Sequence, residues 1–190
     1  PYEFLIVPGF IRAEALAPLL ADFPAIDRPG SFPVSVLDYG PAFRAFVEEL
    51  AGPAIRAAFA AKFGLELAGR PTMLTVRGRT QAKDGAIHTD GQSKLITALI
   101  YMNPAWEEDG GRLRVLRRGD DLDDYAAEVP PDAGTLLAFR RSDRSFHGHK
   151  PFEGPRRSVQ LNWVRDAGVV RLELARHKLS AGFKRLLAVR

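Results

Sequence analysis

Apolar residues recur at helical spacing along the first third of the chain. Leucines fall on one side of residues 14–23, and apolar side chains form similar stripes over 41–50 and 53–64. The second and third stripes each begin with a proline, which is tolerated in a first helical turn, and a glycine closes the third. This pattern predicts three helices, which we expect to form a helical support layer over residues 1–68.

From about residue 70 the pattern changes to short apolar runs with a period of two, separated by glycine, proline and aspartate. Strands of this length and spacing are typical of an antiparallel sandwich or barrel. Apolar positions at helical spacing return at the C-terminus and predict a helix over 176–190. We therefore expect an α+β, mainly β fold in a single domain, 1–190, with a β core over 69–175. The predicted strands are 72–77, 94–102, 112–117, 134–139, 145–149, 157–164 and 169–174.

Composition narrows the classes of function. The chain has 190 residues, 46% of them hydrophobic, which suits one globular domain. It has no cysteine, which excludes disulfides, thiolate metal sites, iron–sulfur clusters and cysteine nucleophiles. The longest apolar run, 95–102, is too short to span a membrane, and no signal peptide is visible, so we expect a cytoplasmic protein. The net charge is +4, but the basic residues are spread out and no nucleic-acid partner is expected.

The candidate chemistry lies at His88 and Asp90, followed much later by His147. His88 and Asp90 are two positions apart, so on an extended segment both side chains point to one side. Two imidazoles and one carboxylate on one face of a metal, with other positions open, are the ligands of non-haem Fe(II) oxygenases. His149 has the same parity as His147 and stays an alternative ligand.

An inward-facing arginine would complete such a site, because a metal-chelating 2-oxo acid carries a second carboxylate that a guanidinium can bind through two hydrogen bonds. Arg157 shares a strand face with the apolar residues Val159, Leu161 and Trp163, so we expect it to point inward. Arg156 is the alternative. Tyr101 has two interpretations at this point, a hydrogen bond to the same carboxylate or one to the backbone.

These motifs together resemble the Fe(II)/2-oxoglutarate-dependent dioxygenases, in particular the prolyl 4-hydroxylase-like branch. The resemblance covers about half of the chain and is carried by residues 88–90, 100–106, 110–113, 146–149 and 157–163. It implies a double-stranded β-helix, or jelly roll, with Fe(II) held by His88, Asp90 and His147. It further implies a 2-oxoglutarate pocket formed by Arg157, Tyr101, Thr97, Leu99, His149 and Trp163.

The implied reaction uses dioxygen, converts 2-oxoglutarate to succinate and carbon dioxide, and hydroxylates an unactivated C–H bond; ascorbate is compatible as a reductant. Because Asp90 is present, hydroxylation is favoured over halogenation. The resemblance does not establish that proline is the target, and the substrate is expected to be a peptide or a small molecule. A non-catalytic sensor that binds metal and 2-oxoglutarate remains an alternative, whereas a zinc hydrolase is disfavoured because no His-Glu-x-x-His motif is present.

The polar segment 78–85 directly precedes His88. It is either a lid over the substrate or an ordinary exposed loop. If it is a lid, Arg77, Arg79 and Lys83 would give it a positive lining that suits an acidic peptide or an anionic metabolite. The sequence gives no indication of the oligomeric state.

Overall fold

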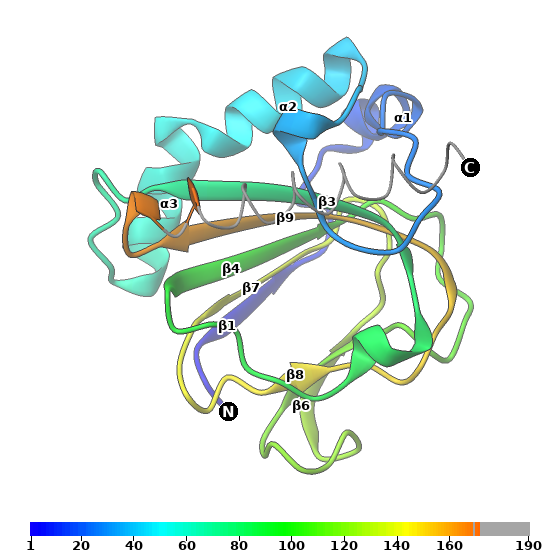
Figure 1. Ribbon diagram of the computed structural model, residues 1–190, viewed down its shortest axis with the longest axis vertical. Helices are drawn as coiled ribbons and strands as arrows, with labels where there is room; N and C mark the ends of the chain where they lie inside the picture. The colour runs from blue at the N-terminus through cyan, green and yellow to red at the C-terminus, as the bar shows by residue number, and fades with distance from the viewer. Residues whose placement is uncertain (169, 172–190) are drawn as a thin grey trace, which may run out of the picture.

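The computed structural model describes residues 1–168 and 170–171, in which a layer of helices covers an antiparallel β core (Figure 1). The helices are α1 (Ala13–Ala21), α2 (Pro41–Ala51) and α3 (Pro53–Phe63). Proline opens α2 and α3, and Gly64, with φ of 58°, ends α3 in the left-handed conformation that favours glycine. The three predicted helices are therefore confirmed, with boundaries that differ by a few residues.

The larger sheet has six strands in the order β1-β7-β4-β9-β3-β2, with antiparallel neighbours throughout. A smaller sheet has the order β6-β5-β8. An isolated antiparallel bridge between His88 and His147 attaches the segment before β4 to β8. The strands are β1 (Phe4–Val7), β2 (Phe32–Pro33), β3 (Thr72–Thr80), β4 (Lys94–Tyr101), β5 (Leu113–Leu116), β6 (Tyr125–Val129), β7 (Leu136–Arg140), β8 (His147–Gly148) and β9 (Gly154–Val164).

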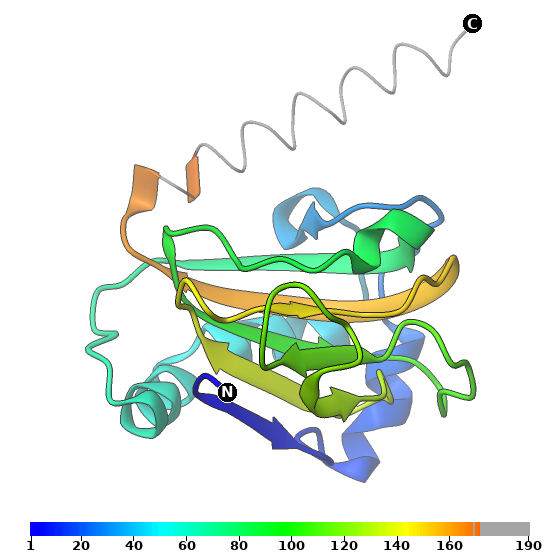
Figure 2. The same ribbon diagram turned by 90° about the horizontal axis from the view of Figure 1, so that it is seen from below.

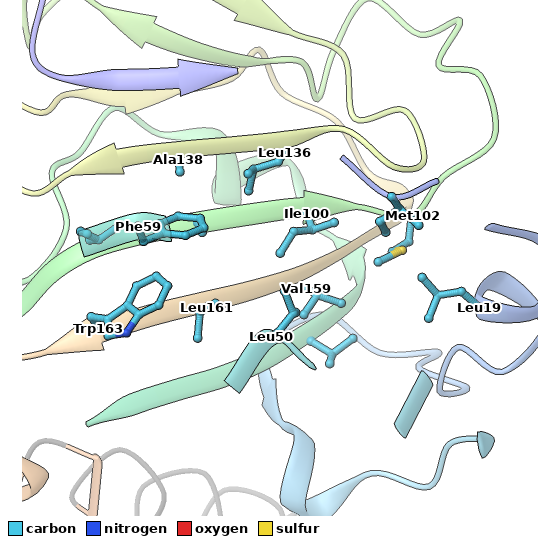
Figure 3. Packing of buried hydrophobic residues seen from close by; sticks show 14 of the residues in the cluster. Leu19, Leu50, Phe59, Ile100, Met102, Leu136, Ala138, Val159, Leu161 and Trp163 are labelled. Atoms are coloured by element: carbon cyan, nitrogen blue, oxygen red, sulfur yellow. The ribbon is translucent and has the colours of Figure 1, made fainter. Parts of the chain in front are cut away.

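The two sheets face one another, and the helices lie on the outer face of the larger sheet (Figures 1 and 2). Because side chains alternate along a strand, β4 and β9 send one set of residues toward the helices and the other set between the sheets. Ile100, Leu161 and Trp163 belong to the core under the helices, as Figure 3 shows. Tyr101 and Phe139 belong to a second core between the sheets. This is the double-stranded β-helix arrangement that we expected.

The structure corrects three details of the predicted elements. The first third of the chain is not purely helical, since β1 pairs with β7 and β2 pairs with β3. A four-residue apolar run such as Phe4–Val7 cannot be distinguished from part of a helix by its period. Strand β6 was not predicted. Strand β3 continues into the segment 78–85, and the remainder forms a short 3₁₀ helix, η2 (Ala82–Gly85).

The last two elements predicted from the sequence lie largely outside the described residues. The predicted helix over 176–190 and, apart from 170 and 171, the predicted strand over 169–174 lie beyond them. Within the described part of the chain, no helix is both long and apolar enough to cross a membrane.

Candidate active site

His88, Asp90 and His147 meet at the open edge between the two sheets. Their ligand atoms all lie within 4.8 Å of one another, and the two imidazole ring centroids are 4.3 Å apart. Backbone hydrogen bonds of 3.0 Å run in both directions between His88 and His147, so the β bridge itself brings the two rings together. Within the described residues this is the one group of histidine and acidic side chains arranged to hold a metal ion.

Both imidazoles are held in the tautomer that a metal requires. Nδ1 of His88 lies 2.8 Å from the carbonyl oxygen of Ala86, and Nδ1 of His147 lies 2.9 Å from that of Ser145. A carbonyl oxygen only accepts, so each Nδ1 carries the proton and each Nε2 keeps a free lone pair. Burial, partly offset by the charge of Asp90, lowers the pKa of His147 to about 4. His147 is therefore neutral near pH 7, the state in which an imidazole binds a metal.

Strand β4 holds the carboxylate of Asp90. Lys94 Nζ lies 2.7 Å from Oδ1, while Thr97 Oγ1 donates to Oδ2 over 2.5 Å. Burial alone would raise the pKa of Asp90, but Lys94, His147 and these hydrogen bonds bring it below its usual value. Asp90 is therefore ionised, as a metal ligand must be, although its side chain is only 9% exposed.

A cavity of about 400 Å³ extends from the three candidate ligands into the space between the sheets. Arg156, which is 5% exposed, lines it, and its guanidinium carbon lies 5.4 Å from the ring centre of the fully buried Tyr101. The Arg156 Nε donates to the carbonyl of Gly111. One terminal nitrogen of Arg156 and the hydroxyl of Tyr101 are buried and have no hydrogen-bond partner. Two unpartnered donors side by side are suited to a bound carboxylate, such as the distal carboxylate of 2-oxoglutarate.

Burial acts on both members of this pair. It lowers the pKa of Arg156 and raises the pKa of Tyr101, and the positive charge of Arg156 opposes the rise at Tyr101. The guanidinium still carries its charge, because arginine does not lose its proton in proteins. The cavity therefore contains a buried cation that an anionic ligand would neutralise.

The prediction that Arg157 points inward is wrong. Arg157 is exposed and its guanidinium lies over the ring of Phe23, 5.4 Å from the ring centre, on the outer face of the sheet. The alternation along the strand is as predicted, but the apolar set packs against the helices and the polar set faces the cavity. Ser158 and Gln160 accordingly line the cavity together with Arg156.

Trp163 also lies on the other side of the sheet from its predicted position. Its ring packs against Phe59 of α3, with ring centres 4.8 Å apart, in the core under the helices (Figure 3). Trp163 is fully buried there and does not line the cavity. The prediction that it contributes to the co-substrate pocket is therefore wrong, for the same reason as that for Arg157.

Three other residues of the predicted co-substrate pocket line the cavity. Thr97 and Leu99 line the cavity from β4, and His149 lines it from the segment after β8. His149 is not part of the group that could hold a metal, and its Nδ1 lies 2.8 Å from the carbonyl oxygen of Lys150. Burial, together with the charge of Arg156, lowers the pKa of His149 to about 4.

Two polar contacts in the cavity wall were not predicted from the sequence. Lys94 was not singled out, although it stands four positions after Asp90. Arg77 forms an ion pair of 2.7 Å with Asp84 of η2. This pair joins β3 to η2, and Thr80 and Asp84 of the segment 78–85 line the cavity. Of the three basic residues expected to give a lid its positive lining, Arg77 lines the cavity, whereas Lys83 is exposed.

Comparisons with known proteins agree with this geometry. Residues 78–165 match the family described as the 2OG-Fe(II) oxygenase superfamily. None of the curated protein sequences compared with the chain matches it. A prolyl-4-hydroxylase from Pseudomonas putida has a similar structure, with a TM-score of 0.60 and 20% identity over 87% of this chain and 94% of that one.

Two further structures are similar. The viral collagen prolyl hydroxylase of Paramecium Bursaria Chlorella virus-1, solved with 2OG, has a TM-score of 0.56 and 14% identity over 85% of this chain and 96% of that one. An oxidoreductase of the 2OG-Fe(II) oxygenase family from Burkholderia pseudomallei has a TM-score of 0.57 and 15% identity over 86% of this chain and 85% of that one. At these identities the likeness concerns the fold. The segment that matches this family contains the whole His88–Asp90–His147 group and Arg156.

Proposed function

We propose that this chain is an Fe(II)- and 2-oxoglutarate-dependent dioxygenase that hydroxylates an unactivated C–H bond of a peptide or small molecule. The proposal rests on one observation: a single cavity contains both a candidate metal site and a candidate anion site. His88, Asp90 and His147 line it, and so does Arg156, beside the hydroxyl of Tyr101. A metal site without an anion site, or the reverse, would not support this reaction.

The chain's own residues bind and orient the reactants. His88, Asp90 and His147 would hold Fe(II) through two Nε2 atoms and a carboxylate oxygen, which leaves the remaining metal positions free. We place the distal carboxylate of 2-oxoglutarate at Arg156 and Tyr101, with Thr97, Leu99 and His149 along the wall. When bound, the iron would supply the site at which dioxygen is reduced, with 2-oxoglutarate oxidised to succinate and carbon dioxide; one oxygen atom would go to succinate and the other to the C–H bond of the substrate.

We further propose that the organic substrate carries a negative charge. Arg77 and Lys94 line the cavity in addition to Arg156, whereas the acidic residues that line it, Asp84 and Asp90, are already paired with them. Once a divalent metal occupies Asp90 and 2-oxoglutarate neutralises Arg156, positive charge remains in the cavity. A carboxylate on a metabolite or an acidic peptide would balance this charge. A cytoplasmic location, the use of ascorbate and the absence of a nucleic-acid partner stay predictions.

The test is an aerobic incubation of the protein with Fe(II), 2-oxoglutarate and ascorbate, in which succinate is measured. Fractionated lysate peptides and metabolites are added, and products are screened by mass spectrometry for the gain of one oxygen atom. His88→Ala and Asp90→Ala serve as controls. We expect succinate and oxygenated product to require Fe(II), 2-oxoglutarate and both side chains. Succinate that forms without Fe(II) or without these side chains would contradict the proposal, and 2-oxoglutarate binding with no turnover in any fraction would indicate a sensor.

A further inference from the structure

Lys94 is an unusual neighbour for a metal ligand. Its ammonium lies 2.7 Å from Asp90 Oδ1, and the two side chains are only 17% and 9% exposed. Lys94 lines the cavity, and among the described residues its one ion pair is with Asp90. The proposed metal ion would therefore bind to a carboxylate that already has a buried cation beside it.

Asp90 does not need Lys94 to keep its orientation. Thr97 donates to the other carboxylate oxygen, and Thr97 Oγ1 itself lies 2.9 Å from Asn162 Oδ1 on β9. Arg141 donates from Nε to the backbone carbonyl of Asp90 over 3.1 Å. The contacts of Thr97 and Arg141 come from two different segments and hold the carboxylate and the backbone of Asp90. Removal of the Lys94 ammonium would therefore leave Asp90 in place but without its counter-ion.

The charge of Lys94 has opposite effects in the two states of the site. In the metal-free protein the ammonium neutralises a buried carboxylate, which stabilises that state. In the metal-bound protein the same ammonium lies within a few ångströms of a divalent cation and repels it. Both effects act against metal binding.

We propose that Lys94 is a placeholder cation, which occupies Asp90 in the metal-free protein and thereby weakens the binding of divalent metals at this site. The inference rests on the proposed metal site but is separable from it. With metal bound, the ammonium is displaced from its sole acidic partner in the described structure and becomes available to other anions in the cavity. A neutral residue at this position would bind metal more tightly and release it more slowly.

The primary experiment titrates the metal-free protein with Mn²⁺ near neutral pH and follows free Mn²⁺ by electron paramagnetic resonance. The variant Lys94→Met is shorter by only the terminal nitrogen and removes the charge, whereas Lys94→Arg keeps the charge. We expect Lys94→Met to lower the Kd for Mn²⁺ by about tenfold, the effect of removing one charge a few ångströms from another in a partly buried site. Lys94→Arg should stay within about twofold of the wild type, because its charge is retained.

Two further variants distinguish the effect of the Lys94 charge from a loss of support for the Asp90 carboxylate. Thr97→Val removes a hydrogen bond from an uncharged donor to the Asp90 carboxylate, so we expect it to raise the Kd for Mn²⁺. Lys62→Met makes the same substitution at an exposed position on α3 and should have no effect. If Lys94→Met leaves the Kd unchanged or raises it as Thr97→Val does, Lys94 merely supports Asp90 and the placeholder proposal is overturned.

A second readout uses the unmodified protein, so it does not depend on the folding of a variant. Nitrogen NMR of the lysine ammonium groups is recorded before and after addition of the diamagnetic ion Zn²⁺, with the Lys94 signal assigned from its loss in Lys94→Arg. We expect this signal to shift strongly on metal binding while the Lys62 signal stays in place. A Lys94 signal that does not move would contradict the displacement. If wild-type protein and His88→Ala instead bind Mn²⁺ and Zn²⁺ equally weakly, the metal site of the proposed function fails as well.

Discussion

The guanidinium carbon of Arg156 lies 5.4 Å from the ring centre of Tyr101, and each side chain has a buried donor atom without a partner. Buried donors are normally satisfied in folded proteins, so two orphaned donors, one of them on a residue that lines the cavity, indicate a ligand. The neighbouring Arg157, by contrast, is exposed on the other face of β9. This contrast between adjacent arginines leads to the first prediction.

Arg156→Gln should raise the KM for 2-oxoglutarate by roughly a hundredfold, because it removes a charge-assisted pair of hydrogen bonds from a buried site. Arg157→Gln is the matched control and should leave this KM unchanged. Initial rates of succinate formation measure both. A larger effect at Arg157 than at Arg156 would show that the assignment is reversed.

Tyr101→Phe should have opposite effects on stability and on co-substrate binding. The hydroxyl is buried without a partner, so its removal should stabilise the ligand-free protein by about 1 kcal/mol. The same change removes a donor to the carboxylate and should weaken 2-oxoglutarate binding about fivefold to tenfold. Thermal unfolding with and without 2-oxoglutarate measures both effects. A Phe variant that is less stable in the absence of ligand would argue that the hydroxyl has another role.

Gly85→Ala should distort the cavity wall. A Cβ at Gly85 would overlap the backbone carbonyl oxygen and the ring of His149, neither of which can move without disturbing the bond to Lys150. Overpacking of this kind costs about 1–3 kcal/mol, which urea denaturation would detect. We also expect weaker 2-oxoglutarate binding, because His149 lines the cavity. Gly91→Ala is the control for stability, since its Cβ would have no neighbour closer than 3.9 Å.

Trp163 should stabilise the fold but should not contribute to 2-oxoglutarate binding. Trp163→Ala would leave a large void against Phe59 and destabilise the fold by about 3–5 kcal/mol. Trp163→Phe is the milder variant that should remain folded, and its KM for 2-oxoglutarate should equal that of the wild type. A large rise of this KM in a stably folded Trp163→Phe protein would mean that Trp163 does contribute to the pocket.

The ion pair between Asp84 and Arg77 predicts a pH dependence of stability. Burial alone would raise the pKa of Asp84, but the backbone of Gln81 and the charge of Arg77 hold it below its usual value. A carboxyl whose pKa is lower in the folded state stabilises the fold above its unfolded pKa, about 3.9, and loses this effect as the pH falls through the folded value. Both partners are partly exposed, so we expect about 1 kcal/mol.

Asp84→Asn should accordingly be less stable than the wild type at pH 7, and the difference should disappear in strong acid. Urea denaturation of both proteins across this range provides the measurement. A difference that persists unchanged below the pKa of the carboxyl would show that a hydrogen bond, and not the charge, stabilises the segment 78–85.

Local patterns in the sequence were sufficient for much of the fold and for the group of side chains that could hold a metal. The helices at Pro41 and Pro53 follow from apolar spacing and from the backbone restrictions of proline and glycine, which act within a few residues. His88 and Asp90 share a side because they are two positions apart on an extended segment, and a downstream histidine completes a ligand set with few chemical alternatives. The period of β9 likewise shows which of its residues share a face.

Tertiary structure decided which face of β9 points at the site. A period of two separates Arg156 from Arg157 but cannot tell which set meets the cavity, because both faces of this strand are covered, one by helices and one by the opposite sheet. The apolar face fits the helices, where Trp163 meets Phe59, and this leaves the polar face for the cavity. The contact of Lys94 with Asp90 was equally hidden, since it depends on how the segment before β4 folds back against that strand.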